Sequence, residues 1–280
     1  MRNVPVSGVA VRAKALVLAH DGRVAIRASS FDIPSGKITA VIGPNGSGKS
    51  TLLDGIAGLI HPSSGSLVVS PADEQRIAYV LQTRKVNEAL PVTVREVVTM
   101  GRYASRGAYG RLTATDRQIV DESLARMAIT DLADRHLNEL SGGQRQRVFV
   151  AQGLAQDHDM LLLDEPLTGL DLISAQAIDS VIHHENAHGC TVVMSTHDLA
   201  EARAADHVVL LSGGVVASGP PGDVLTEDHL AAAYGGMSVH RDGDGLVIDD
   251  PAHQPVEERH VHRDRTIHTE AIPDDRHGGS

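Results

Sequence analysis

The stretch GPNGSGKS at residues 43–50 decides what kind of fold this chain forms. It fits the phosphate-loop pattern of Gly, four residues and Gly-Lys-Ser without a mismatch. The apolar run before it, residues 38–42, is typical of a buried strand, and residues 51–57 after it are typical of a helix. Strand, loop and helix in this order are the context in which the motif binds phosphate. The sequence therefore predicts a nucleoside-triphosphate site.

The predicted site combines the backbone and the side chains of one loop. Glycines let the backbone curl so that successive N–H groups point at phosphate oxygens, and the helix N-terminus adds about half a positive charge. Lys49 is expected to reach the β- and γ-phosphates, and Ser50 to hold Mg²⁺. A plain glycine-rich turn is the alternative, but eight matching positions in this context disfavour it. The candidate nucleotide-binding residues are Gly43, Pro44, Asn45, Gly46, Ser47, Gly48, Lys49, Ser50 and Thr51.

Two carboxylates end a second apolar run, LLLDE at residues 161–165. Asp164, at the strand end, is placed to orient Mg²⁺. Glu165, one residue on, is placed to polarise a water for attack on the γ-phosphate. A solvated acidic turn is the alternative, which the phosphate loop upstream disfavours.

The segment LSGGQ at residues 140–144 is a second phosphate-seeking element. Ser141 and Gln144 have capping-box spacing for a helix that continues to residue 154. Gly142 and Gly143 leave the helix N-terminus bare, so that a phosphate can approach its N–H groups. One chain already supplies a complete phosphate loop. We therefore expect these four residues to serve a nucleotide on another subunit.

With these motifs, residues from about 9 to 234 resemble the ATP-binding subunits of ABC transporters. The resemblance implies ATP and Mg²⁺ as cofactors and roles for three further residues. Gln82, in YVLQ, matches the glutamine that approaches Mg²⁺ and senses the permease. Asp171 matches an aspartate at the dimer interface, and His197 matches the switch histidine that contacts the γ-phosphate. His20 stands where the family usually has an aromatic residue on adenine, so weaker stacking is expected.

The pattern along the chain predicts an α/β fold: a phosphate-loop NTPase core with a parallel sheet, an N-terminal antiparallel β-layer and a helical signature subdomain. The ATPase domain is expected over residues 1–238, with the helical subdomain at about 88–155. Residues 239–280 are rich in histidine and acidic side chains, and their apolar residues are sparse and unpatterned. This composition predicts a disordered tail. Strands are expected at 9–18, 23–33, 38–42, 160–163, 191–195 and 207–211, and helices at 92–101 and 116–127.

Composition excludes several classes of protein. A net charge of −11 argues against a nucleic-acid surface. No apolar stretch reaches bilayer-spanning length and no signal peptide is evident, which predicts a protein in the cytosol or on the cytosolic face of a membrane. The resemblance to ABC transporters implies the second, a peripheral protein on the cytoplasmic face of the cell membrane. The one cysteine, Cys190, begins an apolar run and is interpreted as an inert core thiol. The HExxH pattern at residues 184–188 is followed by a glycine and a strand, which indicates a helix C-terminus rather than a protease site.

The segment at residues 90–103 is similar to the manganese/zinc/iron importer ATPases, and residues 150–156 are similar to their zinc branch. The resemblance implies an ATP-hydrolysing subunit of an importer for a transition-metal cation, zinc or else manganese. Its implied partners are a second copy, a membrane permease and, indirectly, an extracytoplasmic metal-binding protein. The ATPases of siderophore and cobalamin importers have much of the same sequence in these segments and stay an alternative. A soluble ABC ATPase without a transport role is a further alternative.

Overall fold

The computed structural model describes residues 8–20, 22–70, 76–81, 91–106, 111–235, 239–242 and 245–248. Its main sheet has the strand order β5-β6-β7-β3-β8-β9, in which only β9 runs antiparallel to its neighbour. Every residue of β3, β6 and β7 is buried, as expected for strands covered on both faces. The strands are β3 (Ile38–Ile42), β5 (Ile77–Val80), β6 (Met160–Asp164), β7 (Thr191–Thr196), β8 (His207–Leu211) and β9 (Val215–Gly219).

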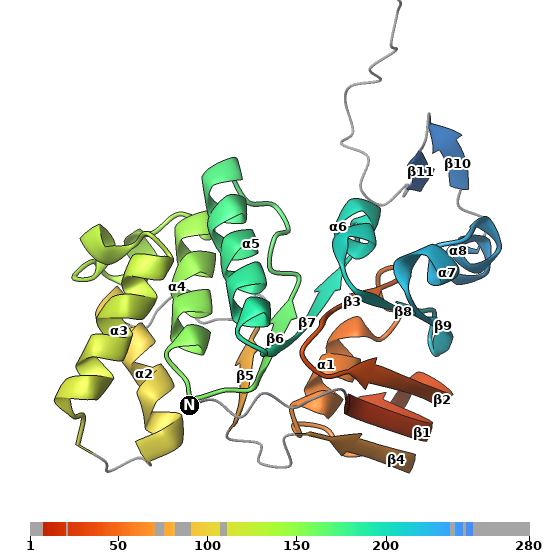
Figure 1. Cartoon of the computed structure of the whole chain (residues 1–280), viewed down its shortest axis with the longest axis horizontal. Helices are drawn as coiled ribbons and strands as arrows, with labels where there is room; N and C mark the ends of the chain where they lie inside the picture. The colour runs from red at the N-terminus through yellow and green to blue at the C-terminus, as the bar shows by residue number, and fades with distance from the viewer. Residues whose placement is uncertain are drawn as a thin grey trace, which may run out of the picture.

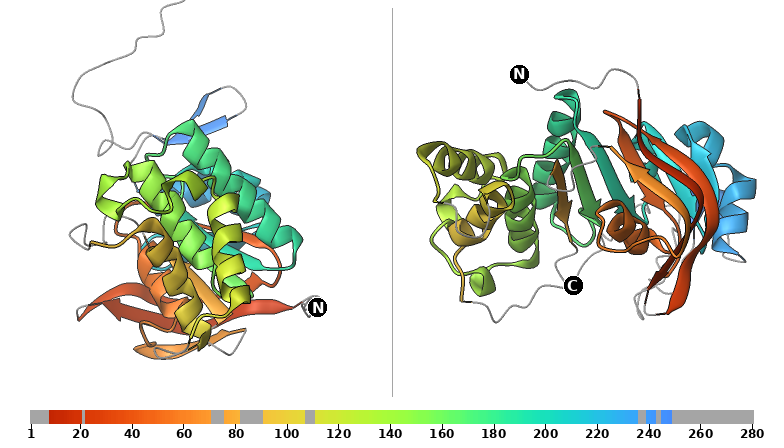
Figure 2. Two further views of the ribbon diagram at one scale, coloured as in Figure 1. Left: turned by 90° about the vertical axis from the view of Figure 1, so that its left-hand side faces the viewer. Right: turned by 90° about the horizontal axis from the view of Figure 1, so that it is seen from below.

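An antiparallel sheet of order β2-β1-β4 forms a second layer, shown with the main sheet in Figures 1 and 2. Its strands are β1 (Val9–His20), β2 (Arg23–Pro34) and β4 (Ser64–Val69). Helix α1 (Lys49–Ile56) contacts all three strands and also β6 and β7 of the main sheet. Leu52 and Leu53 of this helix are fully buried in the core between the two sheets. The phosphate loop is thus fixed by a helix that is packed on both sides.

The other face of the main sheet carries the remaining helices of the core. Side chains alternate along β3, so that Val41 faces α1 whereas Ala40 and Ile42 join the opposite core. The opposite core includes residues from α4 (Gly142–Leu154), α5 (Leu172–Ala187), α6 (Leu199–Ala204), α7 (Pro221–Val224) and α8 (Glu227–Tyr234).

The segment expected to form the helical subdomain contains α2 (Val94–Arg106), α3 (Ala114–Arg126) and α4, with short 3-10 turns at Thr130–Leu132 and Leu137–Glu139. Figure 1 shows α2 and α3 at the end of the molecule farthest from the β1–β2–β4 layer. Val120 and Leu124 of α3 and Met127 directly after it are buried, and Ile119 is partly buried.

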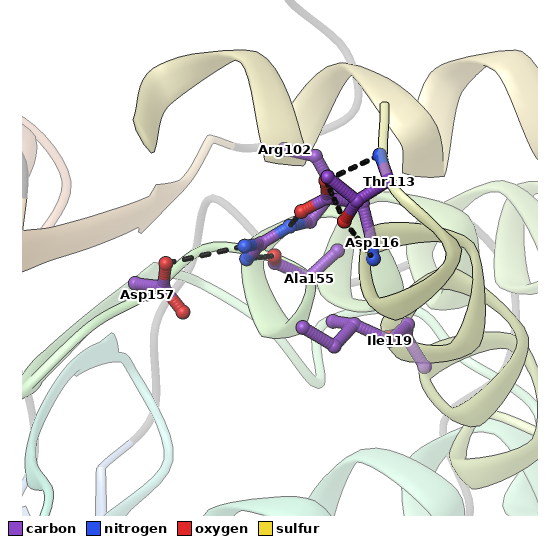
Figure 3. Close-up of polar contacts among 7 residues, drawn as sticks. Arg102, Thr113, Asp116, Ile119, Ala155 and Asp157 are labelled. Atoms are coloured by element: carbon purple, nitrogen blue, oxygen red, sulfur yellow. Dashed lines mark hydrogen bonds and ion pairs between the residues drawn. The ribbon is translucent and has the colours of Figure 1, made fainter. Parts of the chain in front are cut away.

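A buried ion pair ties the three helices together (Figure 3). Arg102 of α2 is only 3% exposed, and its Nε donates to Asp116 Oδ1 of α3 at 3.0 Å. Its Nη1 donates to the carbonyl of Ala155, directly after α4, at 2.6 Å, and its Nη2 to Asp157 Oδ2 at 3.2 Å. The other carboxylate oxygen of Asp116 accepts from the backbone and hydroxyl of Thr113. One guanidinium therefore fixes the mutual positions of α2, α3 and the end of α4.

Two short strands lie at the start of the expected tail. Residues Val239–Asp242 and Gly245–Ile248 pair as antiparallel strands β10 and β11. Strand pairing at these eight positions was not predicted from the sequence, whereas disorder of the tail stays a prediction. Residues 249–280 lie outside the described part of the chain. Among the described helices, none is long and apolar enough to cross a membrane.

We predict that Arg102→Ala lowers the free energy of unfolding by about 3–5 kcal/mol, because it leaves the buried Asp116 carboxylate without its cation. Urea unfolding of the purified chain measures this loss. Arg95→Ala is the matched control, since Arg95 pairs with Asp121 on the exposed surfaces of the same two helices and such pairs contribute less than about 1 kcal/mol. Equal losses in the two variants would contradict a structural role for the Arg102 pair.

Candidate functional site

The phosphate loop connects β3 to α1 in a conformation that requires glycine. Gly48, the N-cap of α1, has φ 103°, and no side chain caps the helix at this residue. A Cβ on Gly43 would lie 2.2 Å from the carbonyl oxygen of Leu211. Alanine at position 43 would therefore displace the loop from β8. The result is a helix N-terminus whose first N–H groups are left to a ligand, the arrangement that suits a phosphate.

Lys49 and Ser47 are both buried in this loop. Lys49 Nζ donates to the carbonyl oxygens of Gly43 at 2.9 Å and Pro44 at 3.4 Å. Burial lowers the pKa of Lys49, while the nearby Glu165 and Asp164 carboxylates act to raise it. The Ser47 hydroxyl, 4% exposed, has no hydrogen-bond partner among the described residues. A buried lysine and an unsatisfied hydroxyl beside bare N–H groups fit a bound phosphate.

One serine of the next strand contacts the Asp164 carboxylate and the Glu165 backbone. Asp164 pairs in register with Ser195 of β7, and the Ser195 hydroxyl donates to Asp164 Oδ1 at 2.7 Å. The same hydroxyl accepts the backbone N–H of Glu165 at 2.8 Å. Glu165 has φ 48°, a left-handed conformation that is unfavourable for a residue with a side chain. Such strain is concentrated at functional sites, which agrees with the predicted role of Glu165 in polarising the attacking water.

His197 lies in the turn between β7 and α6 and is exposed. Its neighbours are fixed by hydrogen bonds: the Thr196 hydroxyl donates to Glu201 Oε2 at 2.6 Å and accepts from the Asp198 N–H at 2.9 Å. Asp198 Oδ1 in turn caps α6 by accepting from Ala200 N at 2.6 Å. The turn is therefore ordered on both sides of His197, at the same sheet edge as Asp164.

The predicted capping box at the start of α4 is present. Ser141 Oγ accepts from Gln144 N at 3.3 Å, and Gln144 Oε1 accepts from Ser141 N at 3.0 Å. A Cβ on Gly143 would lie 2.6 Å from Asp171 Oδ2 and 2.7 Å from Ser174 Oγ, whereas one on Gly142 would meet nothing within 4 Å. Gly143 thus lies against Asp171 of its own chain, and Gly142 faces open space.

Asp171 caps helix α5 within its own chain. Its carboxylate accepts from the N–H and the hydroxyl of Ser174, both at 2.9 Å. These hydrogen bonds lower the pKa of Asp171. The structure thus gives Asp171 a local role in capping α5, and its place at a dimer interface stays a prediction.

Two predicted site residues are less well defined. His20, the last residue of β1, is exposed and forms no part of the phosphate loop. Gln82 lies outside the described residues, directly after Leu81. The strand before it is connected to α1, because the Tyr79 hydroxyl donates to Asp54 Oδ1 at 3.0 Å. Burial and the carboxylates of Asp164 and Asp54 raise the pKa of Tyr79, so it stays protonated.

The HExxH pattern does not assemble a metal site of the protease kind. Its two histidines, His184 and His188, are exposed with ring centroids 4.2 Å apart, and His188 is the C-cap of α5. Glu185 between them is buried, and it pairs with Arg126 and His158. Burial acts to raise the pKa of Glu185, but the contacts with His158 and Arg126 lower it to about 2.

Comparisons with known proteins agree with this geometry. The sequence profile of the ABC transporter family matches residues 26–168. The chain is 39% identical to the chelated iron transport system membrane protein YfeB of Yersinia pestis, over 82% of this chain and 80% of YfeB. It is 37% identical to the manganese transport system ATP-binding protein MntA of Synechocystis, over 79% and 87%, respectively. It is also 37% identical to the zinc transport system ATP-binding protein TroB of Treponema pallidum, over 84% and 91%.

Solved structures share the fold. An inward-facing ABC transporter of metal-chelate type matches with a TM-score of 0.73 and 28% identity, covering 88% of this chain and 99% of that one. A dimeric ATP-binding cassette bound to ADP and Pi matches with a TM-score of 0.66 and 27% identity, over 75% and 98%. The chain belongs to the ABC transporter family. Within it, the chain is an ATP hydrolase, the cassette that binds and hydrolyses the nucleotide.

Sequence reasoning missed Ser195 and the Tyr79–Asp54 bond. Ser195 is one residue of an apolar strand, and only its register opposite Asp164 reveals that it contacts the acidic strand. Aligning DE at residues 164–165 with ST at residues 195–196 would have placed Ser195 beside Asp164. The Tyr79–Asp54 bond joins residues 25 positions apart, and no local pattern indicates it.

Ser195→Ala is predicted to lower the ATPase rate about 10- to 100-fold, because Asp164 and Glu165 lose their shared orienting hydroxyl. ATP affinity should change little, since the phosphate loop is untouched; a steady-state assay with a nucleotide-binding titration separates the two. Ser195→Thr keeps the hydroxyl and should restore most of the rate. A normal rate in Ser195→Ala would exclude this positioning role.

Gly143→Ala should destabilise the isolated chain by about 1–2 kcal/mol, because the Asp171 cap of α5 must open to admit the methyl group. Thermal denaturation of the nucleotide-free protein provides the measurement. Gly142→Ala is the matched control and should leave stability unchanged or slightly raised, as its methyl group would enter open space. Equal effects of the two substitutions would contradict the contact between Gly143 and Asp171.

Proposed function

We propose that this chain is the ATP-hydrolysing subunit of an importer for a transition-metal cation, zinc in the first place and manganese in the second. It would power a separate membrane permease from the cytoplasmic face of the membrane. The observation that carries the ATPase part is the meeting of the phosphate loop, Asp164, Glu165 and His197 at one edge of the main sheet. The relatives named for iron, manganese and zinc transport support the metal part.

The residues at this edge suit distinct steps of hydrolysis. Lys49 and the loop N–H groups would hold the β- and γ-phosphates, and His197 would contact the γ-phosphate. Glu165 would take the proton of the attacking water. Ser50 and Asp164 offer the oxygen ligands that Mg²⁺ prefers, together with Gln82 by resemblance; bound Mg²⁺ neutralises phosphate charge. Ser195 would keep Asp164 and Glu165 in place for these roles.

The arrangement of the sheet supports a site that is shared by two copies. The phosphate loop follows β3, whereas α4 packs against β5, α2, α3 and α5. β5 is three strands away from β3 in the sheet, about 14–15 Å at the usual strand spacing. Ser141–Gln144 would therefore serve a nucleotide on the phosphate loop of a second copy, with Asp171 at the same interface. The dimeric relative bound to ADP and Pi is consistent with such pairing.

The proposed metal is based on the relatives named for metal transport and on the resemblance of residues 90–103 and 150–156 to importer ATPases. The chain itself would contact ATP and Mg²⁺, and an extracytoplasmic protein would deliver the transported ion to the permease. A siderophore or cobalamin importer is the second candidate, favoured by the iron-chelate relative and the metal-chelate transporter structure. His20 would take the place of the adenine-stacking aromatic residue, with a smaller stacking face.

We expect Glu165→Gln to bind ATP with near-normal affinity but to hydrolyse it about 10²–10⁴-fold more slowly, since the amide cannot accept the water proton. The trapped nucleotide should shift the protein to a dimer, which size-exclusion chromatography with ATP detects. Glu122→Gln, an exposed site on α3, should behave as the unchanged chain. Turnover near normal in Glu165→Gln would refute the assigned base.

The substrate is decided by transport in the reconstituted complex with its permease and binding protein. We expect ATP-driven uptake of labelled zinc, or else of manganese, that is abolished by Glu165→Gln in this subunit. Uptake of a ferric siderophore in place of the free cations would transfer the assignment to the second candidate. A chain that hydrolyses ATP but associates with no permease would contradict both.

A further inference from the structure

Three side chains that commonly bind metals meet at the edge of the main sheet opposite the phosphate loop. His158 lies two residues before β6, Glu185 lies in the last turn of α5, and Cys190 directly precedes β7. They are 5%, 2% and 3% exposed, respectively. Their imidazole, carboxylate and thiol ligand atoms all lie within 4.8 Å of one another. A buried set of one nitrogen, one oxygen and one sulfur donor has the composition of a transition-metal site.

The orientation of His158 presents one ring nitrogen to this cluster. Its Nδ1 lies 2.9 Å from the carbonyl oxygen of Gln156. A carbonyl oxygen only accepts, so Nδ1 carries the proton of that hydrogen bond. Nε2 therefore faces inward and lies 3.2 Å from Glu185 Oε2. A positive charge between these two atoms, a proton or a metal ion, satisfies both.

The Glu185 carboxylate is oriented in the same manner. Its Oε1 is held by Arg126 Nη2 at 2.8 Å, which directs Oε2 towards His158. Metal-binding histidines and carboxylates characteristically have their second polar atom fixed by a polar neighbour in this way. Ligand atoms around a tetrahedral zinc ion lie about 3.3–3.6 Å apart, as its bond lengths require. The separation of Nε2 and Oε2 is already close to that value.

We propose that His158 Nε2, Cys190 Sγ and a carboxylate oxygen of Glu185 bind one thiophilic divalent cation of the zinc class. Binding forms one bond from the metal to each of the three atoms. The thiol proton, and any proton on Nε2, are released to solvent. The sulfur ligand selects against Mg²⁺, the ion of the nucleotide site, because Mg²⁺ prefers oxygen ligands. Cys190 is buried in the core, as the sequence predicts, and the proposal adds a metal-binding role to it.

This site is separate from the nucleotide machinery. His158 and Cys190 precede strands β6 and β7, whereas Asp164 and His197 stand at the other ends of the same strands. At about 3.3 Å per residue the two sites lie roughly 15–20 Å apart. The proposal also differs from transport of a metal by the permease, since this ion is bound by the ATPase chain itself. It holds whichever substrate the transporter carries.

Cobalt titration of the full chain tests the proposal. Cys190 is the one cysteine of the sequence, so any thiolate-to-cobalt charge-transfer absorption must come from this residue, despite the many histidines. Co²⁺ is supplied both to the native protein and during refolding, because the ligands are buried. We expect a near-ultraviolet band that saturates at about one equivalent and is abolished by an excess of Zn²⁺, the tighter-binding ion.

Variants and a chemical probe complete the test. Cys190→Ser should abolish the band, and His158→Gln should weaken cobalt binding at least about tenfold. His184→Gln, an exposed histidine of the same helix, should leave the band unchanged. Zinc should also protect the Cys190 thiol of the unsubstituted chain from alkylation, a readout that needs no variant to fold. Absence of the band under both conditions, with equal alkylation rates with and without zinc, would overturn the proposal.

Discussion

The parallel pairing of β3, β6 and β7 is the constraint on which the site depends. Parallel strands end at the same edge of a sheet. The phosphate loop after β3, the carboxylates at the end of β6 and the turn with His197 after β7 therefore lie together, although they are far apart in the sequence. The register is fixed residue by residue, with Asp164 opposite Ser195. A slip by one residue would turn Asp164 away from Ser195, and the Asp164 carboxylate and the Glu165 backbone would lose the hydroxyl that they share.

The sequence predicted this edge well because each part has a strong local signal. The phosphate loop, the acidic strand and the capping box each occupy consecutive residues, and the strands between them are continuous apolar runs. Contacts between elements that are distant in the sequence could not be predicted from such local patterns. Ser195, the bond between Tyr79 and Asp54, and the packing of Gly143 on Asp171 join residues distant in sequence. They follow from register and helix packing, for which a single sequence carries no direct signal.

The helices α2, α3 and α4 are held together by a buried ion pair rather than by strand pairing. Arg102 lies in the segment at residues 90–103 that is similar to importer ATPases, and the structure gives it a physical role as the buried cation that joins α2, α3 and the end of α4. Such a pair is costly to form and strongly destabilising to break, so it favours one arrangement of the three helices. Helix α4 begins within the LSGGQ segment at residues 140–144, called the signature segment below. The Arg102 contacts position this helix as one unit with α2 and α3.

The central claim is that the nucleotide site is completed by a second copy. Mixing two defective variants tests it directly: Lys49→Ala impairs the phosphate loop, and Ser141→Arg blocks the signature segment. If the site is shared between copies, a mixed dimer contains one intact site, so ATP hydrolysis in the mixture should clearly exceed the sum of the two variants alone. If each chain hydrolyses ATP with its own phosphate loop and signature segment, the mixture should show only that sum, and the account would be contradicted.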